Sequence, residues 1–348
     1  MKSLLDDFDH ELVGKLFIGD QKVDMPYKLM FKWARGTPKQ VARVGVYCLQ
    51  DCFLLVQLAI HFQIFTCNVE MSRVTHTPME ALETRGQQIK VINQLVWSAH
   101  RKERRTDGNG SYILNTPKAF SGGPSDSYMG ATVIDAKAKF YKEPIATLDF
   151  MSLYPSIILA NNFCSSCLVQ DDAFANIPGV EYVEIIVDNK RYLWAKNFAG
   201  VIPDMIVNLL SARKGAKKLM NAAIQRIQAL KEERASAAPE RYDDIDAEIK
   251  RVQIQKAVYN ARQLALKISA NSIYGFMGAV KTGKYHCLAV ADCVTFRARE
   301  MLNHTVDLVL GFAKCEVVYG DTDSVMVRFF DVADVEECAD VARKAADF

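Results

Sequence analysis

The pattern of apolar and polar positions predicts long helices joined by polar turns. A nearly continuous apolar stretch indicates a helix over residues 40–65, and a second helical stretch covers 78–100. Two longer helices are predicted over 204–235 and 241–274, and the tract Ala235–Pro239 between them supplies a turn. The two form an antiparallel helical hairpin with one very basic arm.

Short β-prone segments lie between and after these helices. The segment IATLDF is apolar and predicts a buried strand, and Pro155 shortly beyond it fits the first position of a following helix. The predicted strands are 145–150, 182–187, 191–194, 316–319 and 324–329. Further helices are expected over 286–310 and within 331–348. The pattern therefore predicts an α+β protein.

Composition narrows the class of protein. The chain has 348 residues, of which 50% are hydrophobic and 24% are charged, and this excludes wholesale disorder, a collagen or coiled-coil rod and a supercharged tail. The length suits two domains, or one large domain with an excursion. No uninterrupted apolar run is long enough for a membrane helix, and the acidic start MKSLLDDFDH is unlike a signal peptide. Nine scattered cysteines favour a reduced, intracellular protein.

The charge is balanced overall but unevenly placed. The 43 basic and 41 acidic residues leave a net charge of +2, which by itself argues weakly against a polyanionic partner. Between Ser211 and Arg234, however, the sequence contains seven basic residues and only two acidic ones. Arg213 and Lys217 within it are spaced i and i+4. A second basic cluster spans Arg101–Arg105. Such clusters suit a surface that meets phosphates, whereas charge alone favours a solvated helix face.

The most distinctive local feature is the turn Gly320–Ser324 between two predicted strands. It presents Asp321 and Asp323, spaced i and i+2, at the end of an apolar sheet. Carboxylates grouped in this way repel each other unless a divalent cation lies between them. The alternative is an ordinary polar turn, since Asp, Thr, Ser and Gly all favour turns.

A third carboxylate, Asp149, ends the strand 145–150 just before a turn into a helix. The amides of Ser152, Leu153 and Tyr154 at that helix start would face an anion, and the helix dipole adds to the attraction. A carboxylate for a metal beside amides for phosphates is the pairing that a metal–triphosphate needs. The alternative is that Asp149 only caps the turn.

The second long helix carries a polar face close to its end. Lys267, Asn271 and Tyr274 are spaced i, i+4 and i+7 and share that face, and Gly275 is expected to end the helix as a C-cap. A solvated face is the alternative, although the aromatic residue and its apolar neighbours make it less favoured.

These segments resemble family B DNA polymerases. Residues 149–156 (DFMSLYPS) are similar to the family's first palm motif, 267–275 (KISANSIYG) to its fingers motif, and 319–324 (YGDTDS) to its second palm motif. Tyr128–Ala131 resembles the motif between the exonuclease and polymerase domains, and Tyr47–Asp51 resembles the third exonuclease motif. The resemblance covers nearly the whole chain and is greatest to delta-type replicases of eukaryotes and large DNA viruses. It favours a large DNA virus as the source.

The resemblance implies a right-hand polymerase fold. An antiparallel palm sheet and helical-hairpin fingers would follow the C-terminal end of an RNase H-like 3′–5′ exonuclease domain. The implied divisions are 1–68 for the exonuclease end, 69–127 for connecting helices and a linker, 128–199 for the first part of the palm, 200–279 for the fingers and 280–348 for the second part of the palm.

The resemblance also implies an activity and its site. The activity is template-directed transfer of a nucleotide from a dNTP to a primer 3′-hydroxyl, with two Mg²⁺ ions (Mn²⁺ able to substitute) bound by Asp149, Asp323 and the carbonyl of Phe150, and with Asp321 in support. The implied nucleotide-binding residues are Phe150, Ser152, Leu153, Tyr154, Arg213, Lys217, Lys267, Asn271, Tyr274 and Gly275. Tyr154 would pack under the deoxyribose.

The family pattern is incomplete in this chain. Tyr47 and Asp51 would be a remnant of the exonuclease site, whose two earlier acidic motifs would lie upstream of Met1. The thumb and the basic motif for the duplex would follow Phe348, so an internal fragment of a longer polymerase is expected. The implied partners are primer–template DNA, dNTPs and a sliding clamp or processivity factor that binds absent regions, with no membrane. The expected location is intracellular, in the host nucleus or at a cytoplasmic replication site for a virus.

Two rival functions remain. A catalytically silent polymerase-like subunit would usually have lost its acids, so the intact Asp149, Asp321 and Asp323 count against it. An RNA-making palm enzyme is disfavoured by Tyr154 and by the Asp-Thr-Asp form of the second palm motif. Separately, the single C-x-x-C at 164–167 is weak evidence for zinc or redox chemistry, and buried free thiols are favoured there.

Overall fold

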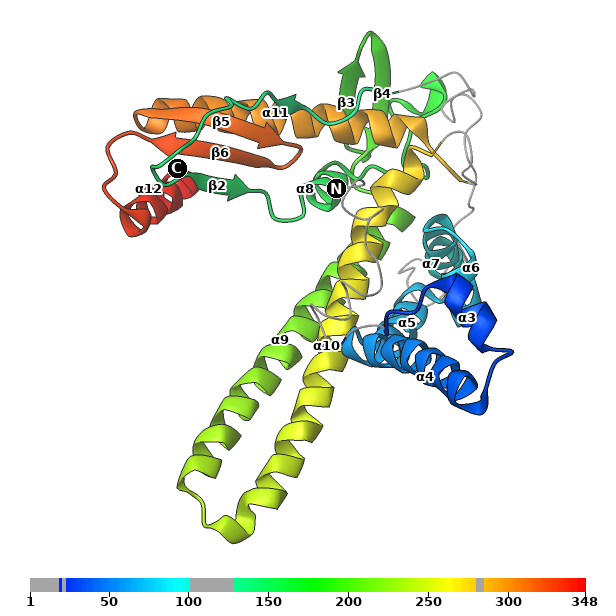
Figure 1. Cartoon of the computed structure of the whole chain (residues 1–348). Helices are drawn as coiled ribbons and strands as arrows, with labels where there is room; N and C mark the ends of the chain where they lie inside the picture. Colours follow the sequence, from blue (N-terminus) through cyan, green and yellow to red (C-terminus); the bar gives the residue numbers. More distant parts are fainter. Residues whose placement is uncertain (1–18, 21–22, 101–127, 199, 280–284) are drawn as a thin grey trace. The chain divides into compact units, whose positions relative to one another are not determined.

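The structure is a computed structural model that describes residues 19–20, 23–100, 128–198, 200–279 and 285–348 (Figure 1). The basic cluster Arg101–Arg105 and the predicted linker after it lie outside the described residues. The chain divides into two compact units. The first holds residues 1–71 and 218–262, and the second holds 72–217 and 263–348.

The first unit is helical. It contains α3 (Tyr27–Trp33), α4 (Pro38–His61), the start of α5 (Ile64–Thr75) and one part each of the two longest helices. Thr37 and Gln40 form a capping box at the start of α4, where Pro38 needs no hydrogen-bond donor. Gln63 has a φ of 53° and separates α4 from α5, so the predicted helix over 40–65 is two helices.

Helix α4 is apolar on average, although polar residues interrupt its apolar sequence. It is the one helix of the described residues that is long and apolar enough to cross a membrane, with a mean hydropathy of 1.5 over an 18-residue window of which 11% is buried. Isolated polar residues such as Gln50 and Asp51 break the run without lowering the average below that of a membrane span. A single such helix is weak evidence for a membrane span.

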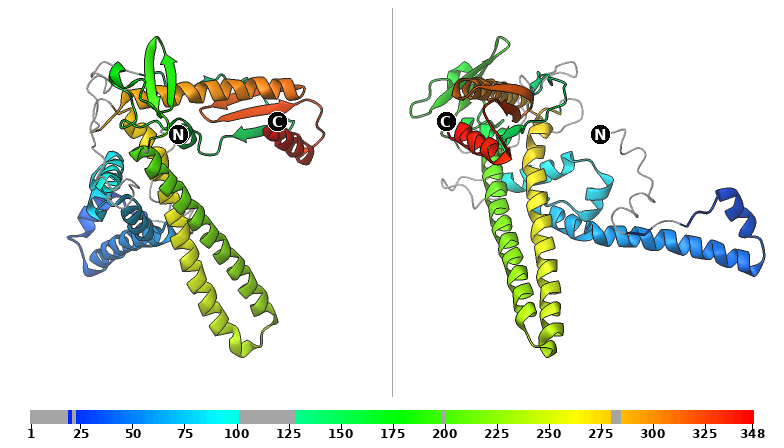
Figure 2. Two further views of the ribbon diagram at one scale, coloured as in Figure 1. Left: turned by 180° about the vertical axis from the view of Figure 1, so that it is seen from behind. Right: turned by 60° about the vertical axis from the view of Figure 1, so that its left-hand side comes forward.

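The longest helices are α9 (Val201–Ser236) and α10 (Tyr242–Met277), which lie side by side and are joined by the short 3₁₀ turn η3 (Pro239–Arg241) (Figure 2). The predicted helical hairpin is therefore confirmed. Within the first unit the two helices share a small apolar core that includes Leu230 and Ile245.

The second unit contains an antiparallel four-stranded sheet in the order β1-β5-β6-β2. Its strands are β1 (Val133–Ile134), β2 (Ala146–Asp149), β5 (Cys315–Asp321) and β6 (Ser324–Phe329). Helices α11 (Leu288–Phe312) and α12 (Val335–Asp347) pack on this sheet, α12 against β2 (Figure 1). The predicted strand 145–150 is present, but as a half-buried edge strand.

The rest of the second unit surrounds its larger core. The remaining elements are α6 (Met79–Thr84), α7 (Gln88–His100), α8 (Leu153–Asn161), the 3₁₀ turn η2 (Asp172–Phe174) and the hairpin of β3 (Tyr182–Val187) and β4 (Lys190–Ala195). The two-residue turn of that hairpin has positive φ at Asp188 and Asn189, as the right-handed twist of hairpin strands favours. The core includes the fully buried Trp194, Phe163 and Ile202.

Three local predictions are wrong. The stretch 78–100 is two helices, because the extended Arg85 separates α6 from α7. Pro155 is the third residue of α8, since the helix begins at Leu153 after Ser152 adopts a left-handed conformation. Gly275 does not cap α10, which continues to Met277. Glycine lacks the apolar contacts of Phe276 and Met277, and these buried residues extend the helix.

Candidate active site

The β5–β6 turn holds two of the predicted acidic residues. Asp321 pairs with Ser324 across the hairpin, and Thr322 between the acids has a φ of 56°. The backbone N–H of Asp323 donates to the carbonyl of Asp321 at 2.6 Å, and that of Thr322 donates to Thr132 at 3.1 Å. Backbone hydrogen bonds therefore fix the turn from which both carboxylates extend.

The neighbouring edge strand brings Asp149 beside this turn. Asp149 pairs with Ser324 in the β2–β6 ladder, and the N–H of Phe150 donates to the carbonyl of Asp323 at 2.8 Å. Partial burial first, and then the negative charge of Asp149, raise the pKa of the Asp323 carboxyl. The ladder thus holds two carboxylates close enough to repel each other.

Asp321 lies apart from that pair. Its carboxylate accepts hydrogen bonds from the Thr322 hydroxyl at 2.8 Å and from the Tyr319 hydroxyl at 3.4 Å. It is exposed and does not line the cavity described next. The supporting role predicted for Asp321 stays a prediction, and its hydrogen bonds are compatible with it.

A cavity of about 470 Å³ opens between β2, α8, α9 and α10 within the second unit. Ten of the predicted site residues line it, together with Met151 and Pro155, which were not among the predicted site residues. The ten are Asp149, Phe150, Ser152, Leu153, Tyr154, Arg213, Lys267, Asn271, Tyr274 and Asp323. Segments far apart in the sequence therefore meet around one space.

One wall of the cavity is the start of α8. Ser152 precedes the helix with φ 61° and ψ 49°, so the chain turns sharply after Asp149 and enters the helix at Leu153. The first-turn amides of a helix have no acceptor within it, and the helix dipole makes that end attractive to anions. Leu153 and Pro155 are buried and anchor the helix start.

The opposite wall is cationic. Arg213 on α9 and Lys267 on α10 both line the cavity, and the positive charge of Lys267 lowers the pKa of Asp323. The Nε atom of Arg213 is buried without a hydrogen-bond partner among the described residues. A buried donor of this kind is costly unless an acceptor joins it, so the cavity suits an anionic ligand.

Aromatic rings close one end of the cavity. The rings of Tyr154 and Tyr274 lie 4.3 Å apart between centroids, and the Tyr274 hydroxyl donates to that of Tyr128 at 3.3 Å. Burial raises the pKa of both Tyr154 and Tyr274, so both remain neutral donors. Tyr128 contacts Gly278 so closely that any Cβ there would collide with its ring. Tyr128, which belongs to the motif 128–131, does not line the cavity itself but contacts Tyr274 beside it.

Some predicted residues lie elsewhere. Lys217 and Gly275 belong to the same helices but do not line this cavity. Tyr47 and Asp51 lie on one face of α4 in the first unit, where hydrogen bonding to Asp51 raises the pKa of Tyr47. The exonuclease role of these two residues stays a prediction.

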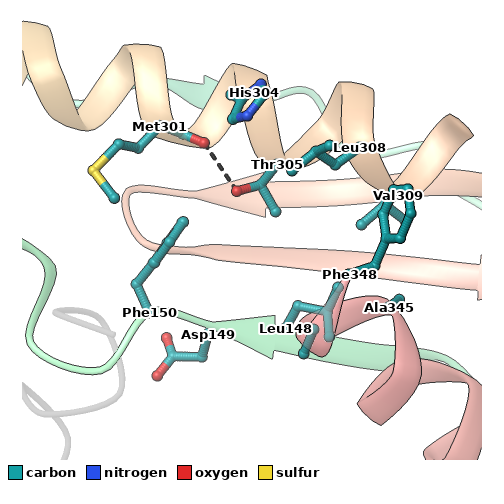
Figure 3. A pocket seen from close by; sticks show the side chains of 11 residues that line it. Leu148, Asp149, Phe150, Met301, His304, Thr305, Leu308, Val309, Ala345 and Phe348 are labelled. Atoms are coloured by element: carbon teal, nitrogen blue, oxygen red, sulfur yellow. Dashed lines mark hydrogen bonds between the residues drawn. The ribbon is translucent and has the colours of Figure 1, made fainter. Parts of the chain in front are cut away.

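A second cavity of about 360 Å³ lies between β2, α11 and α12 (Figure 3). The ring of Phe150 extends toward α11, whereas the carboxylate of Asp149 points away from that helix (Figure 3). The lining is largely apolar, with Leu148, Leu308 and Phe348 among its residues. Phe150 therefore separates an apolar space from the polar cavity.

The oxygen ligands that line the polar cavity can supply part of the coordination of a divalent cation. Asp149 and Asp323 supply hard oxygen ligands, and their mutual repulsion would be relieved by a cation between them. The described residues contain no group of three or more Asp, Glu, His or Cys side chains placed to hold a metal. A backbone carbonyl and the ligand's own oxygens would have to complete the coordination.

Comparison with known proteins assigns the family. The family model of DNA polymerase family B matches residues 77–235 and 244–348. DNA polymerase delta catalytic subunits are similar to this chain: the one from Oryza sativa is 36% identical over 99% of this chain and 28% of its own length, and the one from Glycine max is 37% identical over 99% and 29%.

A solved structure shares the fold. The family B DNA polymerase of Pyrobaculum calidifontis matches with a TM-score of 0.64 at 22% identity, over 99% of this chain and 39% of that one. The chain spans less than a third of the length of the curated delta subunits cited here. The mixed helical and antiparallel-sheet fold that was predicted is thereby confirmed, and the chain belongs to DNA polymerase family B.

Proposed function

We propose that the chain carries the nucleotidyl-transfer site of a template-directed DNA polymerase, with the sheet of the second unit as palm and the α9–α10 hairpin as fingers. The observation that carries this proposal is the single cavity that joins Asp149 and Asp323 to the start of α8 and to Arg213 and Lys267. A carboxylate pair facing cations and helix amides is the arrangement that a metal–triphosphate requires.

The carboxylates of Asp149 and Asp323, with the carbonyl of Phe150, would hold two divalent cations, with Mg²⁺ proposed and Mn²⁺ able to substitute. When bound, these ions supply charge neutralisation and a lowered pKa for the attacking hydroxyl. The protein fixes the two carboxylates through the β2–β6 ladder, so little reorganisation precedes binding.

The triphosphate would lie between α8 and the hairpin. The amides at the start of α8 would donate to its phosphate oxygens, and Arg213 and Lys267 would neutralise charge from the opposite wall. Lys217 and Asn271 are proposed to extend this cationic and polar wall. A lysine beside Asp323 also keeps that acid ionised at lower pH than burial alone would allow.

The aromatic end of the cavity would receive the sugar and base. Tyr154 packs on Tyr274, and its ring would leave no room for a 2′-hydroxyl next to a bound deoxyribose. Tyr274 and Gly275 would lie beneath the new base pair. Discrimination would come from shape and template pairing.

The remaining assignments are proposed on the family resemblance. The division of the chain into exonuclease end, palm and fingers, the 3′–5′ exonuclease role of Tyr47 and Asp51, and a viral source belong here. DNA replication is proposed as the process, with primer–template DNA, dNTPs and a sliding clamp as partners. The proposed location is a nuclear or cytoplasmic replication site. The names of the delta subunits favour a replicative enzyme.

The test is primer extension by the 348-residue chain with Mg²⁺, together with dNTP binding measured by calorimetry. Asp323→Asn keeps the shape of the side chain but removes its charge, and it should abolish extension and weaken Mg²⁺-dependent dNTP binding. Asp331→Asn on the exposed loop after β6 is the matched control and should behave as wild type. Undiminished extension by Asp323→Asn would contradict the proposal.

Tyr154→Ala tests the sugar gate. Removal of the ring should increase ribonucleotide incorporation relative to deoxyribonucleotide incorporation, with dNTP use less affected. Tyr141→Ala, on a partly exposed tyrosine before β2, serves as the control. An unchanged ratio between the two sugars would remove this role from Tyr154.

A further inference from the structure

Two cysteines face each other in a tight turn after α8. The backbone N–H of Cys167 donates to the carbonyl of Cys164 at 2.9 Å, which makes the two residues positions i and i+3 of a β-turn. The Cα atoms of such positions lie within about 7 Å, and disulfides span Cα separations of about 4.4–6.8 Å. A turn of this kind can bring the two Cα atoms into the range that a disulfide spans, and both residues are free thiols here.

The sulfur atoms sit in a polar environment despite their burial. The Cys164 sulfur is 3.1 Å from the Ser166 hydroxyl, and the side-chain amide of Asn162 donates to the Cys167 sulfur at 3.3 Å. Burial opposes ionisation of Cys164, but hydrogen bonds from Cys167, Ser166 and the backbone of Ile202 outweigh it and lower the pKa of its thiol. The hydrogen bond to Cys164, together with burial, raises the pKa of the Cys167 thiol, so Cys167 holds the proton of the pair. Ile202 belongs to the first turn of α9, and a helix start stabilises a thiolate.

One of the two sulfurs is within reach of small solutes. Cys164 is fully buried, whereas Cys167 is 4% exposed and lines a surface cavity of about 480 Å³. Phe174 and Phe198 are among the apolar residues around that cavity. A neutral oxidant the size of water could therefore meet Cys167 first, with Cys164 behind it.

We propose that Cys164 and Cys167 are a redox modification site that closes reversibly to a disulfide with hydrogen peroxide. The Cys167 sulfur attacks one peroxide oxygen, the O–O bond breaks, and the leaving hydroxide takes the thiol proton and departs as water. The Cys164 sulfur then attacks the Cys167 sulfenic acid, the S–S bond forms, and the second oxygen leaves as water. Two thiols and one peroxide give one disulfide and two waters, and a dithiol reductant reverses the change.

The pair lies where two helices are tied together. The Asn162 amide donates to the carbonyls of Ala195 at 2.8 Å and Phe198 at 2.6 Å, just before the start of α9. A Cβ on Gly200 would lie 3.0 Å from the Cys164 side chain, so the turn packs directly on the start of α9. Closure of the disulfide should therefore change the protection of the first turn of α9. The proposal does not depend on polymerase activity.

The experiment exposes the 348-residue chain to hydrogen peroxide, blocks remaining thiols with iodoacetamide after denaturation, and maps peptides by mass spectrometry. The peptide that holds both cysteines should lose two hydrogens, escape alkylation, and recover both reactive thiols after dithiothreitol. It should react at least about tenfold faster than Cys287 and Cys293, because Cys167 lines a surface cavity and Cys164 lies in the same turn to trap its sulfenic acid, whereas Cys287 and Cys293 are fully buried.

Variants separate this site from general oxidation. Cys164→Ser and Cys167→Ser should each abolish the two-hydrogen loss, and Cys287→Ser, a control for a buried thiol of the same unit, should leave it intact. Hydrogen exchange at the amides of Ile202 and Asp204 should differ between oxidised and reduced wild type. Full alkylation of both cysteines after peroxide would overturn the proposal, as would disulfides of either one with another cysteine. The wild-type measurements hold even where a serine variant fails to fold.

Discussion

The two ends of the α9–α10 hairpin use the same basic residue types in different ways. In the first unit, Arg226 pairs with Glu248 at 2.7 Å and Arg234 pairs with Asp246 at 2.5 Å. In the second unit, neither Arg213 nor any other basic side chain on the cavity forms an ion pair with a described residue. A run of positive charge that looks uniform in sequence thus contains paired arginines in the first unit and an unpaired arginine on the cavity in the second.

The difference shows what a count of charges conceals. Exposed ion pairs of the first kind contribute little, about 0.2–1 kcal/mol each, and serve the hairpin itself. A cation without a carboxylate partner, beside a buried unsatisfied donor, retains its charge for a ligand. Asp246 and Glu248 therefore matter for the basic arm, because they pair with two of its arginines and leave Arg213 without a carboxylate partner.

The largest effect is expected for Lys267→Ala. The change removes a cation that faces both Asp323 and the cavity, and the loss of a charge-assisted hydrogen bond should weaken Mg²⁺-dependent dNTP binding about 10- to 100-fold. Calorimetry on the 348-residue chain measures it. Lys250→Ala, on the same helix but in the first unit, is the control. Equal affinities of the two variants would break the distinction between the two regions.

Arg213→Ala should weaken dNTP binding by about tenfold, since it removes a donor that has no protein partner. Arg226→Ala is its counterpart on the same helix and should leave binding unchanged while slightly lowering stability. Binding and thermal unfolding are measured on both variants. A loss of binding in Arg226→Ala as large as in Arg213→Ala would mean that the ion pairs do not divide the arm.

A charge swap tests the paired region. Arg234→Asp should slightly lower the free energy of unfolding, because two carboxylates would then face each other, and adding Asp246→Arg should restore it. Urea unfolding followed by circular dichroism measures both, and dNTP binding should not change. If the second substitution did not restore stability, the ion pair between Arg234 and Asp246 would not contribute to the stability of the hairpin.

The smallest effect is a change in titration. Burial and Asp149 raise the pKa of Asp323, while Lys267 lowers it, so Lys267→Ala should raise that pKa further. A carboxyl whose pKa is raised in the folded state stabilises the fold at pH values below its unfolded-state pKa. That stabilisation is lost as the pH rises through the folded-state pKa, so in the variant it should persist to a higher pH. Carboxyl carbon NMR measures the titration. A pKa that is unchanged or falls would show that Lys267 does not act on Asp323.

Much of the fold was accessible from the sequence because its elements are long or strongly patterned. The helical hairpin, the β5–β6 strands and α11 follow from periodicity and turn residues. The breaks at Arg85 and Gln63 were not predicted, because arginine and glutamine carry no local signal for the end of a helix. The two-residue strand β1 was missed for the same reason, since it exists only by pairing with β5.

The site divides in the same way. Asp149, Asp323 and the start of α8 were predicted because strand ends and helix starts carry local signals. The sequence could not show that Lys217 and Gly275 fall outside the cavity, since one residue along a helix rotates a side chain by about 100°. Tyr128 completes the aromatic end only through a contact with Tyr274 that is remote in sequence.

The sheet order has a consequence for how the chain folds. The β5–β6 hairpin is local and can form within about 1–10 μs, but β2 joins it only across a long loop that includes the whole α9–α10 hairpin. During synthesis Asp149 leaves the ribosome well before Asp323, and its strand has no partner until β6 follows. Joining of β2 to the hairpin is thus expected late, at a rate set by loop closure, and the carboxylates of Asp149 and Asp323 would come together in the same step.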